Sequence, residues 1–127
     1  MERQSLYRIV LIEDSEWVRL GLREQLNRTA EFHVVGEAAS ADEGVESVAR
    51  LSPDLVLLDL SLPDVSGVEA CRRMLAVRPD TRVLMLSVHD ALAQIHEALA
   101  AGAQGYALKD TPVAMWRDAM RRVAGNE

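Results

Sequence analysis

The chain lacks most of the features that mark secreted, membrane-bound or DNA-binding proteins. It has a single cysteine, Cys71, which excludes an internal disulfide framework and favours a reducing compartment. Its formal net charge of −6 argues against direct nucleic-acid binding by this domain, because affinity for phosphates depends on lysine and arginine. No apolar run is long enough to cross a membrane, and no signal-peptide pattern opens the sequence. We therefore expect a cytoplasmic protein that binds neither membranes nor nucleic acid through this domain.

The length and the hydrophobic content of the chain favour one folded domain. Its 127 residues are close to the commonest domain size, and 49% of them are hydrophobic. A domain of this length buries about two-thirds of the surface that its unfolded chain exposes. We therefore expect a single domain over residues 1–127, with a core that needs no disulfide to hold it.

Short apolar segments alternate with amphipathic segments along the whole chain. The apolar segments predict strands at 7–12, 32–36, 55–58, 83–86 and 104–108. The amphipathic segments predict helices at 15–28 and 90–101, and further helices after the capping residues Ser40, Ser66 and Thr111. Pro112 is expected to be the first helical residue after Thr111. Five strands alternating with five helices predict an α/β fold, in which helices cover both faces of a doubly wound parallel sheet.

Polar side chains end four of the predicted strands. They are Glu13 and Asp14 after the first strand, Asp59 after the third, Ser87 after the fourth and Lys109 after the fifth. Because the carboxyl ends of parallel strands meet at one edge of a sheet, where open α/β sheets bind ligands, we expect these side chains to converge. Three carboxylates packed together need a counter-ion, and a hard divalent cation such as Mg2+ suits their oxygen atoms. Since Mg2+ in proteins often bridges carboxylates and a phosphate, the pattern indicates a site for a phosphoryl group.

In this order, the strand-end residues and the segment Leu62-Pro63-Asp64-Val65-Ser66-Gly67 resemble response-regulator receiver domains, the CheY-like family of two-component signalling. The resemblance covers essentially the whole chain and implies the flavodoxin-like (βα)5 fold of that family. Shorter motifs at 19–22, 86–90, 102–106 and 109–111 are similar to the NarL/FixJ subfamily. Members of that subfamily carry a C-terminal helix-turn-helix of the LuxR type.

The resemblance implies a role for each acidic residue. Asp59 would attack the phosphorus of a phosphohistidine, on a sensor histidine kinase or a phosphotransfer protein, and become an acyl phosphate. Mg2+, or Mn2+ in its place, would be held by the side chains of Asp14 and Asp59 and by the backbone carbonyl of Ser61. Glu13 would hold a metal-bound water.

The resemblance also implies a phosphoryl contact and a switch. Lys109 would contact the phosphoryl oxygens, and Ser87 would hydrogen-bond the phosphoryl group and draw its own loop inward. Tyr106 would turn into the space that this movement leaves. His89 and Ser61 flank the entrance and could tune hydrolysis of the acyl phosphate.

The sequence therefore predicts a receiver whose only chemistry is its own phosphorylation and dephosphorylation. Its output is expected to be a DNA-binding, transcription-regulating domain that this chain does not contain. A stand-alone or degenerate receiver that acts as a protein-interaction module is the alternative. A homodimer through the face of the first and last helices is also open, and Trp17 and Trp116 on those helices are expected to be wholly or partly buried.

Two other functional classes fit the sequence less well. Phosphatases of the haloacid dehalogenase type place a second aspartate two residues after the nucleophile, where this chain has Ser61. A flavodoxin-like cofactor site needs a turn that cradles phosphate, but the turn at 13–17 is acidic and has no glycine.

Each predicted site residue has an ordinary structural alternative when it is taken alone. Asp59 could be a turn residue or a helix cap, and Glu13 and Asp14 could cap the first helix. Lys109 could be a solvated surface lysine, and Tyr106 could be ordinary packing at a strand edge. Only the complete set of residues, each at a strand end, favours the phosphoacceptor interpretation.

Four further residues are expected to be structural rather than functional. His33 and His96 are predicted at the surface, Cys71 is predicted to be an inert core thiol, and Leu99 is predicted on the buried face of its helix. Many family members have a cis proline after the lysine, but here the residue is Asp110. We expect a trans peptide, because a cis bond before a residue other than proline is costly.

Overall fold

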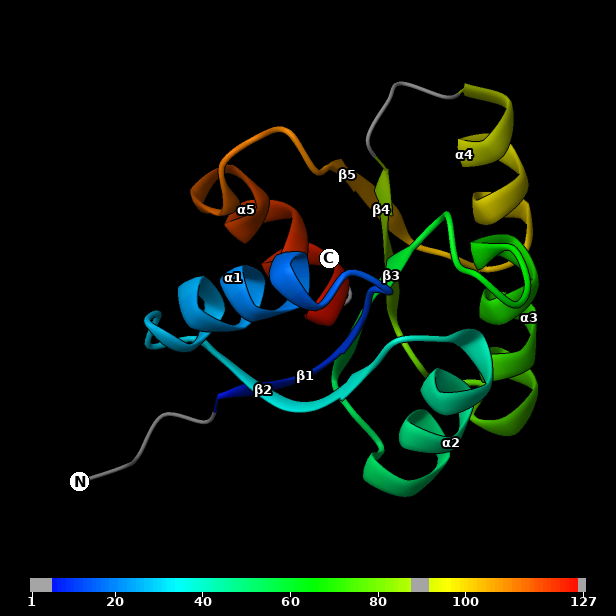
Figure 1. Cartoon of the computed structure of the whole chain (residues 1–127), viewed down its shortest axis with the longest axis horizontal. Helices are drawn as coiled ribbons and strands as arrows, with labels where there is room; N and C mark the ends of the chain where they lie inside the picture. Colours follow the sequence, from blue (N-terminus) through cyan, green and yellow to red (C-terminus); the bar gives the residue numbers. More distant parts are fainter. Residues whose placement is uncertain (1–5, 88–91, 126–127) are drawn as a thin grey trace.

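The computed structural model describes residues 6–87 and 92–125 as five strands and five helices in strict alternation (Figure 1). The elements are β1 (Tyr7–Ile12), α1 (Glu16–Asn27), β2 (Phe32–Ala38), α2 (Ala41–Leu51), β3 (Leu55–Asp59), α3 (Gly67–Val77), β4 (Val83–Ser87), α4 (Leu92–Ala100), β5 (Gly105–Leu108) and α5 (Val113–Ala124). All strand pairs are parallel, in the order β2-β1-β3-β4-β5. The predicted doubly wound α/β fold is confirmed.

The direction of winding changes at β1. This strand pairs with β2 on one side and with β3 on the other, so the chain first moves one way across the sheet and then the opposite way. In open α/β sheets, ligands bind beyond the carboxyl ends of the strands at such a switch point. The fold therefore directs attention to the residues that end β1 and β3.

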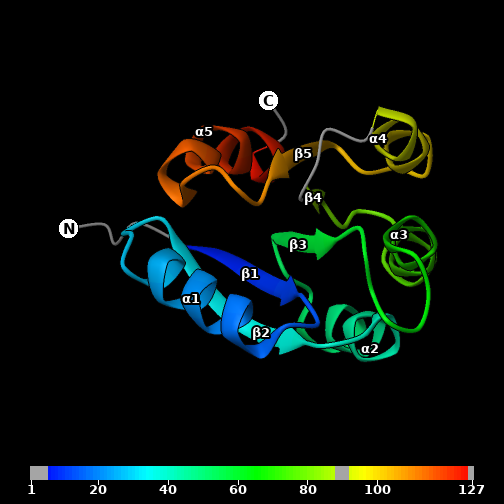
Figure 2. The ribbon, with the colours of Figure 1, turned by 45° about the horizontal axis from the view of Figure 1, so that its top comes forward.

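The helices form one layer on each face of the sheet. Helices α1 and α5 cover one face, and α2, α3 and α4 cover the other (Figures 1 and 2). Ile9 and Leu11 of β1 pack toward α1 and α5, whereas Val10 and Ile12 pack into the core on the opposite face. All four side chains are fully buried. Burial on both faces explains why the strands are continuous apolar runs rather than alternating ones.

The structure extends three strands beyond their predicted ends. β3 includes Asp59 and β4 includes Ser87, so both polar side chains stand on paired strand backbone rather than on a loop. β2 continues to Ala38, past the predicted end at residue 36. None of the helices in the described part of the chain has the length and apolar character that crossing a bilayer requires.

Two of the three predicted helix caps are confirmed. Ser40 and Ser66 are the N-cap residues of α2 and α3, and each side-chain oxygen accepts a hydrogen bond from a backbone N–H of the first helical turn. The predicted cap at Thr111 is wrong, because α5 begins at Val113 after Pro112. The Thr111 hydroxyl instead donates a hydrogen bond back to the carbonyl oxygen of Leu108, at 2.7 Å.

Two apolar side chains predicted to be buried are exposed. Trp17 on α1 is 82% exposed, because α1 buries its other side through Leu22 and Leu26. Nine residues, about two and a half helical turns, place Trp17 opposite Leu26. Leu99 is 43% exposed because α4 meets the core through Ile95 and Ala98. Trp116 is buried as predicted, at 2% exposure.

The chain after β3 makes a tight return at Gly67. The Gly67 N–H donates to the carbonyl oxygen of Leu60 at 2.9 Å, which closes the loop between β3 and α3. A Cβ atom at position 67 would lie 2.6 Å from the Asp59 carbonyl oxygen and 2.7 Å from the Leu60 Cα atom. Only glycine fits this approach of helix to strand.

We expect Gly67→Ala to lower the free energy of unfolding by about 2 kcal/mol, since the added methyl group overlaps backbone atoms. Urea denaturation measures the change. Gly21→Ala in α1 is the matched control, because a Cβ there meets no atom within 4 Å. That substitution should raise the free energy of unfolding by about 0.5–1 kcal/mol through helix propensity. Similar losses in both variants would contradict the close approach at Gly67.

Candidate functional site

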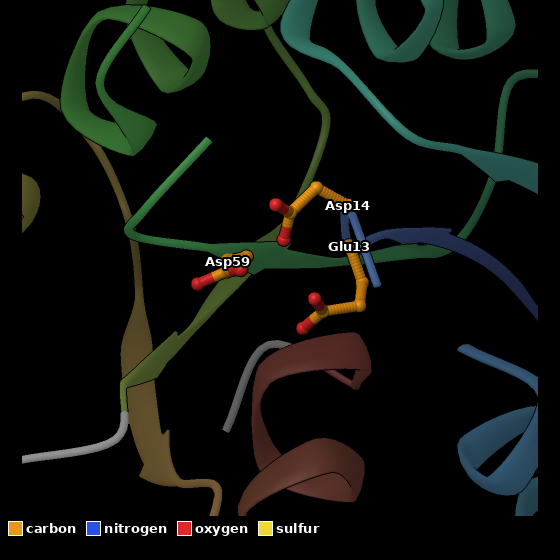
Figure 3. A group of neighbouring side chains, drawn as sticks. All are labelled: Glu13, Asp14 and Asp59. Atoms are coloured by element: carbon orange, nitrogen blue, oxygen red, sulfur yellow. The ribbon is translucent and has the colours of Figure 1, made fainter. Parts of the chain in front are cut away.

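The carboxyl ends of β1 and β3 bring three carboxylates together, as the sequence predicts (Figure 3). Glu13 and Asp14 follow β1, Asp59 is the last residue of β3, and one oxygen of each lies within 4.8 Å of the other two. Glu13 is 1% exposed and Asp59 is 4% exposed, whereas Asp14 is open to solvent. Two of the three acids are therefore buried, which is costly unless a cation is near.

Lys109, directly after β5, supplies that cation. Its Nζ atom lies 3.0 Å from Oδ2 of Asp59 and forms a second ion pair with Oε1 of Glu13. The Lys109 backbone N–H donates to the Ser87 carbonyl oxygen at 2.6 Å, so the lysine is anchored to the end of β4. Lys109 is the only lysine of the chain. The peptide bond between Lys109 and Asp110 is trans, as expected.

The remaining carboxylate oxygens of the buried acids are held by backbone groups. Oδ1 of Asp59 accepts a hydrogen bond from the Ser61 N–H at 3.0 Å, and Oε2 of Glu13 accepts one from the Ser15 N–H at 2.9 Å. Asp14 has no hydrogen-bond or ion-pair partner among the described residues, and the N-cap of α1 is Ser15. Asp14 is therefore not the helix cap that the alternative interpretation suggested.

Burial and neighbouring charges have opposite effects on the pKa of Glu13 and on the pKa of Lys109. Burial raises the pKa of the Glu13 carboxyl above its ordinary value, although the hydrogen bond from Lys109 partly lowers it. Burial alone would lower the pKa of Lys109, but Glu13 and Asp59 outweigh that effect and leave it raised.

Both raised values have the same consequence for stability. The ion pairs of Lys109 stabilise the fold below its ordinary pKa and are lost as the pH rises through the raised value. Glu13 binds its proton more tightly in the folded protein, so its ionisation destabilises the fold as the pH rises through its raised pKa. At neutral pH the ion pairs of Lys109 therefore stabilise the site, and the burial of the Glu13 carboxyl opposes them.

The donor set fits a hard divalent cation. Three carboxylates provide only oxygen ligands, which suits Mg2+ or Mn2+ rather than a soft metal. Subtracting the one charge of Lys109 from the three of the acids leaves two negative charges without a partner cation. A divalent ion would neutralise them.

The predicted switch residues lie on β4, which pairs with β3, and on β5, the edge strand beyond β4. Ser87 at the end of β4 is 6% exposed, and Tyr106 on β5 is 44% exposed, with its ring at the surface. Ser61 is exposed, two residues past Asp59. His89 lies outside the described residues.

Arg19 supports the site in a way that the sequence did not reveal. Its guanidinium donates to the carbonyl oxygen of Glu13 at 2.7 Å and to Oε1 of Glu37 at 3.2 Å. Arg23 pairs with the other carboxylate oxygen of Glu37. Arg19 stands in a motif quoted above, but its contact with β2 depends on the tertiary fold and has no signal in the sequence.

Trp116 and Thr111 hold the loop that follows Lys109. The indole N–H of Trp116 donates to the Thr111 hydroxyl oxygen at 2.8 Å and to the Leu108 carbonyl oxygen at 3.1 Å. The buried ring of Trp116 thereby fixes the end of β5, where Lys109 begins. The sequence placed this tryptophan in the core but did not show that it positions the lysine.

Of the four residues predicted to be structural, Cys71, His33 and His96 lie where the sequence placed them, and Leu99 does not. Cys71 is fully buried, and burial raises the pKa of its thiol to about 11, so it is protonated and inert at neutral pH. His33 and His96 are both exposed.

Comparison with known proteins agrees with the fold and the acidic cluster. A family model described as the response regulator receiver domain matches residues 9–121, a range that includes Glu13, Asp14, Asp59, Ser87 and Lys109. The chain belongs to the response regulator receiver family. The acidic cluster around Asp59 fits the phosphorylation site of such a receiver domain.

Several relatives of this receiver domain regulate transcription. This chain is 37% identical over 116 residues to the transcriptional regulatory protein DegU of Brevibacillus brevis. The matched segment covers 91% of this chain and 49% of DegU. It is also 40% identical over 105 residues to the DNA-binding transcriptional activator DevR/DosR of Mycobacterium tuberculosis. That match covers 83% of this chain and 48% of DevR/DosR. The chain thus spans about half the length of these curated relatives.

A solved structure supports the subfamily. The crystal structure of a LuxR-family two-component response regulator from Aurantimonas sp. SI85-9A1 matches with a TM-score of 0.91 and 33% identity, over 97% of this chain and 88% of that one. The predicted similarity of this receiver domain to regulators of the LuxR type is confirmed.

Removing Lys109 leaves two buried carboxylates without a cation. We expect Lys109→Met to lower the free energy of unfolding by about 3 kcal/mol at neutral pH. The difference from the wild type should shrink in mild acid, where Glu13 becomes protonated, and again in strong alkali, where the wild type loses its own lysine charge. Urea denaturation across this pH range measures both trends.

Lys109→Arg is the control, because it keeps the positive charge and should lose less stability than Lys109→Met. A deficit of Lys109→Met that stays constant at every pH would show that the lysine contributes packing rather than charge.

Proposed function

We propose that this receiver domain accepts a phosphoryl group on Asp59 from a phosphohistidine of a sensor histidine kinase or phosphotransfer protein. The observation that carries the proposal is the environment of the Asp59 carboxylate. It is buried at the end of the central strand, 3.0 Å from Lys109 Nζ, with oxygens of Glu13 and Asp14 within 4.8 Å. A carboxylate held in this way has a cation beside it and a place for a second one.

In the proposed transfer, an oxygen of Asp59 forms a bond to phosphorus. The bond from phosphorus to the imidazole nitrogen breaks, and the nitrogen keeps the electron pair. Protein groups assist such transfers mainly by positioning and by neutralising charge. Lys109 is suited to both tasks, because the Ser87 carbonyl anchors its backbone and its ammonium already faces Asp59. It can transfer part of its ion pairing from Glu13 to the incoming phosphoryl oxygens.

A divalent cation, Mg2+ or Mn2+, is part of this proposal. Asp14 and Asp59 would hold it through their side chains and Ser61 through its backbone carbonyl, while Glu13 would hold one of its waters. When bound, the cation would supply charge neutralisation at the phosphoryl oxygens. The excess negative charge of the cluster supports this assignment, as does the absence of a partner for Asp14 within residues 6–87 and 92–125.

The proposed output is a change at Ser87 and Tyr106 that a second domain reads. Ser87 is buried beside the phosphoacceptor strand and would hydrogen-bond the phosphoryl group. The Tyr106 ring is at the surface and would turn inward afterwards. The names of DegU and DevR/DosR, and the half of each that this domain does not cover, support a transcription-regulating output domain in the full-length protein. In this scheme the receiver is a phosphoacceptor and not an enzyme for external substrates.

A small-molecule phosphodonor tests the central claim. Incubation with acetyl phosphate and Mg2+ should add one phosphoryl group to the intact protein, as measured by mass spectrometry. The gain should be absent in Asp59→Asn, which keeps the shape but lacks the nucleophilic carboxylate, and it should disappear when EDTA removes the metal. A wild-type protein whose mass does not change would instead indicate a degenerate receiver that acts only by binding partners.

Asp14→Asn tests the cation. Without divalent metal, this variant should be more stable than the wild type by about 1 kcal/mol, because repulsion among the three acids is relieved. Added Mg2+ should raise the thermal unfolding midpoint of the wild type and leave that of the variant nearly unchanged. Glu24→Gln, an exposed acid of α1 away from the cluster, should behave like the wild type in both measurements. An equal Mg2+ effect in wild type and Asp14→Asn would remove Asp14 from the ligand set.

A further inference from the structure

The loop between β3 and α3 contacts the start of α2 through the side chain of Asp64. Oδ1 of Asp64 accepts a hydrogen bond from the Ala41 N–H at 2.9 Å, and Oδ2 accepts one from the Asp42 N–H at 3.0 Å. These are the first two N–H groups of α2, which have no carbonyl partner inside the helix. Asp64 is more than twenty residues away in sequence, so this cap comes from a neighbouring loop.

Helix α2 also has a local cap that does not involve Asp64. The Ser40 hydroxyl oxygen accepts a hydrogen bond from the Glu43 N–H at 3.3 Å, and the Ser40 carbonyl accepts one from the Gly44 N–H at 3.0 Å. The carboxylate of Asp64 lies at the positive end of the helix dipole, and its hydrogen bonds, that from Ala41 first, lower its pKa. Asp64 is therefore ionised at neutral pH and ties the loop to the helix.

The same loop carries Ser61, and its two ends are fixed at the phosphoacceptor. The Ser61 N–H donates to Oδ1 of Asp59 at 3.0 Å, and the Gly67 N–H donates to the Leu60 carbonyl oxygen at 2.9 Å. Between these points the loop meets the start of α2 at Asp64. Apolar contacts of Leu62 and Val65 with the core, together with the Asp64 carboxylate, hold this part of the loop.

We propose that Asp64 is a positioning residue for the divalent-cation site. By fixing the middle of the loop against α2, it holds the backbone of Ser61 where its carbonyl can meet the cation. Ser61 lies between its hydrogen bond to Asp59 and the contact of Asp64 with α2, so losing Asp64 leaves only apolar contacts to hold the loop on that side. This inference rests on the proposed function, because the position of Ser61 matters only if a cation binds there.

Asp64→Ala and Ser40→Ala form a matched pair of variants. Both remove side-chain hydrogen bonds from the first turn of α2, but only Asp64→Ala releases the loop. Isothermal titration of Mg2+ into the unphosphorylated protein should show about tenfold weaker binding for Asp64→Ala, the lower end of the range for residues that support metal ligands. Ser40→Ala should bind Mg2+ as the wild type does. Asp64→Asn, which can accept at most one of the two hydrogen bonds with a neutral oxygen, should fall between them.

The Mg2+ dependence of phosphorylation shows whether Asp64 affects cation binding or the phosphoryl transfer itself. The rate of acetyl phosphate labelling of Asp64→Ala should be reduced at limiting Mg2+ and close to that of the wild type at saturating Mg2+. Amide hydrogen exchange should be faster at Ala41 and Asp42 in this variant, which would confirm that the tie is broken.

Two results would overturn the inference, and they can be told apart. If the wild type binds Mg2+ and Asp64→Ala binds it equally well, or if Ser40→Ala weakens binding as much as Asp64→Ala does, Asp64 has no positioning role while the proposed function stands. If the wild type itself binds no Mg2+ and gains no phosphoryl group, the proposed function fails and the inference fails with it.

Discussion

A single ammonium group between two buried carboxylates is the interaction on which the architecture of the site depends. Burial of Glu13 and Asp59 would be unfavourable without Lys109, and Lys109 reaches them only because β5 runs parallel to β4 and ends at the same edge. The sheet therefore does more than support the site. Its register brings together charges from three strands that lie far apart in the sequence.

The ends of β1, β5 and β3 are in turn positioned by residues outside these strands. Arg19 of α1 donates a hydrogen bond to the Glu13 carbonyl, and Trp116 of α5 donates one to the Leu108 carbonyl at the end of β5. Gly67 lets α3 approach the backbone of Asp59. None of these three residues touches the group that would be transferred. They convert a cluster of repelling charges into a rigid one, so the strain of the acids is balanced by packing and hydrogen bonds around them.

The sequence predicted the fold and the meeting of Asp59 with Lys109 because both follow from local patterns. Continuous apolar runs indicate buried parallel strands, and a polar residue at each carboxyl end then has only one edge to occupy. The link from Asp64 to α2 and the pairing of Arg19 with Glu37 could not be predicted, since they depend on how loops and helices pack across the sheet. Trp17 was placed wrongly for a related reason: helical periodicity leaves open which side of α1 faces the sheet until the neighbouring strands are known.

The use of a lysine rather than an arginine at the strand ends has a chemical consequence beyond signalling. The surface ion pairs of the described residues all use arginine, whose guanidinium resists acylation, and the one lysine of the chain stands at the strand ends. Apart from the terminal amine, any reagent or enzyme that acylates amino groups has Lys109 as its sole target here. Such a modification would erase the ammonium charge between Glu13 and Asp59, so amine acylation and the electrostatics of this pocket are coupled through one atom.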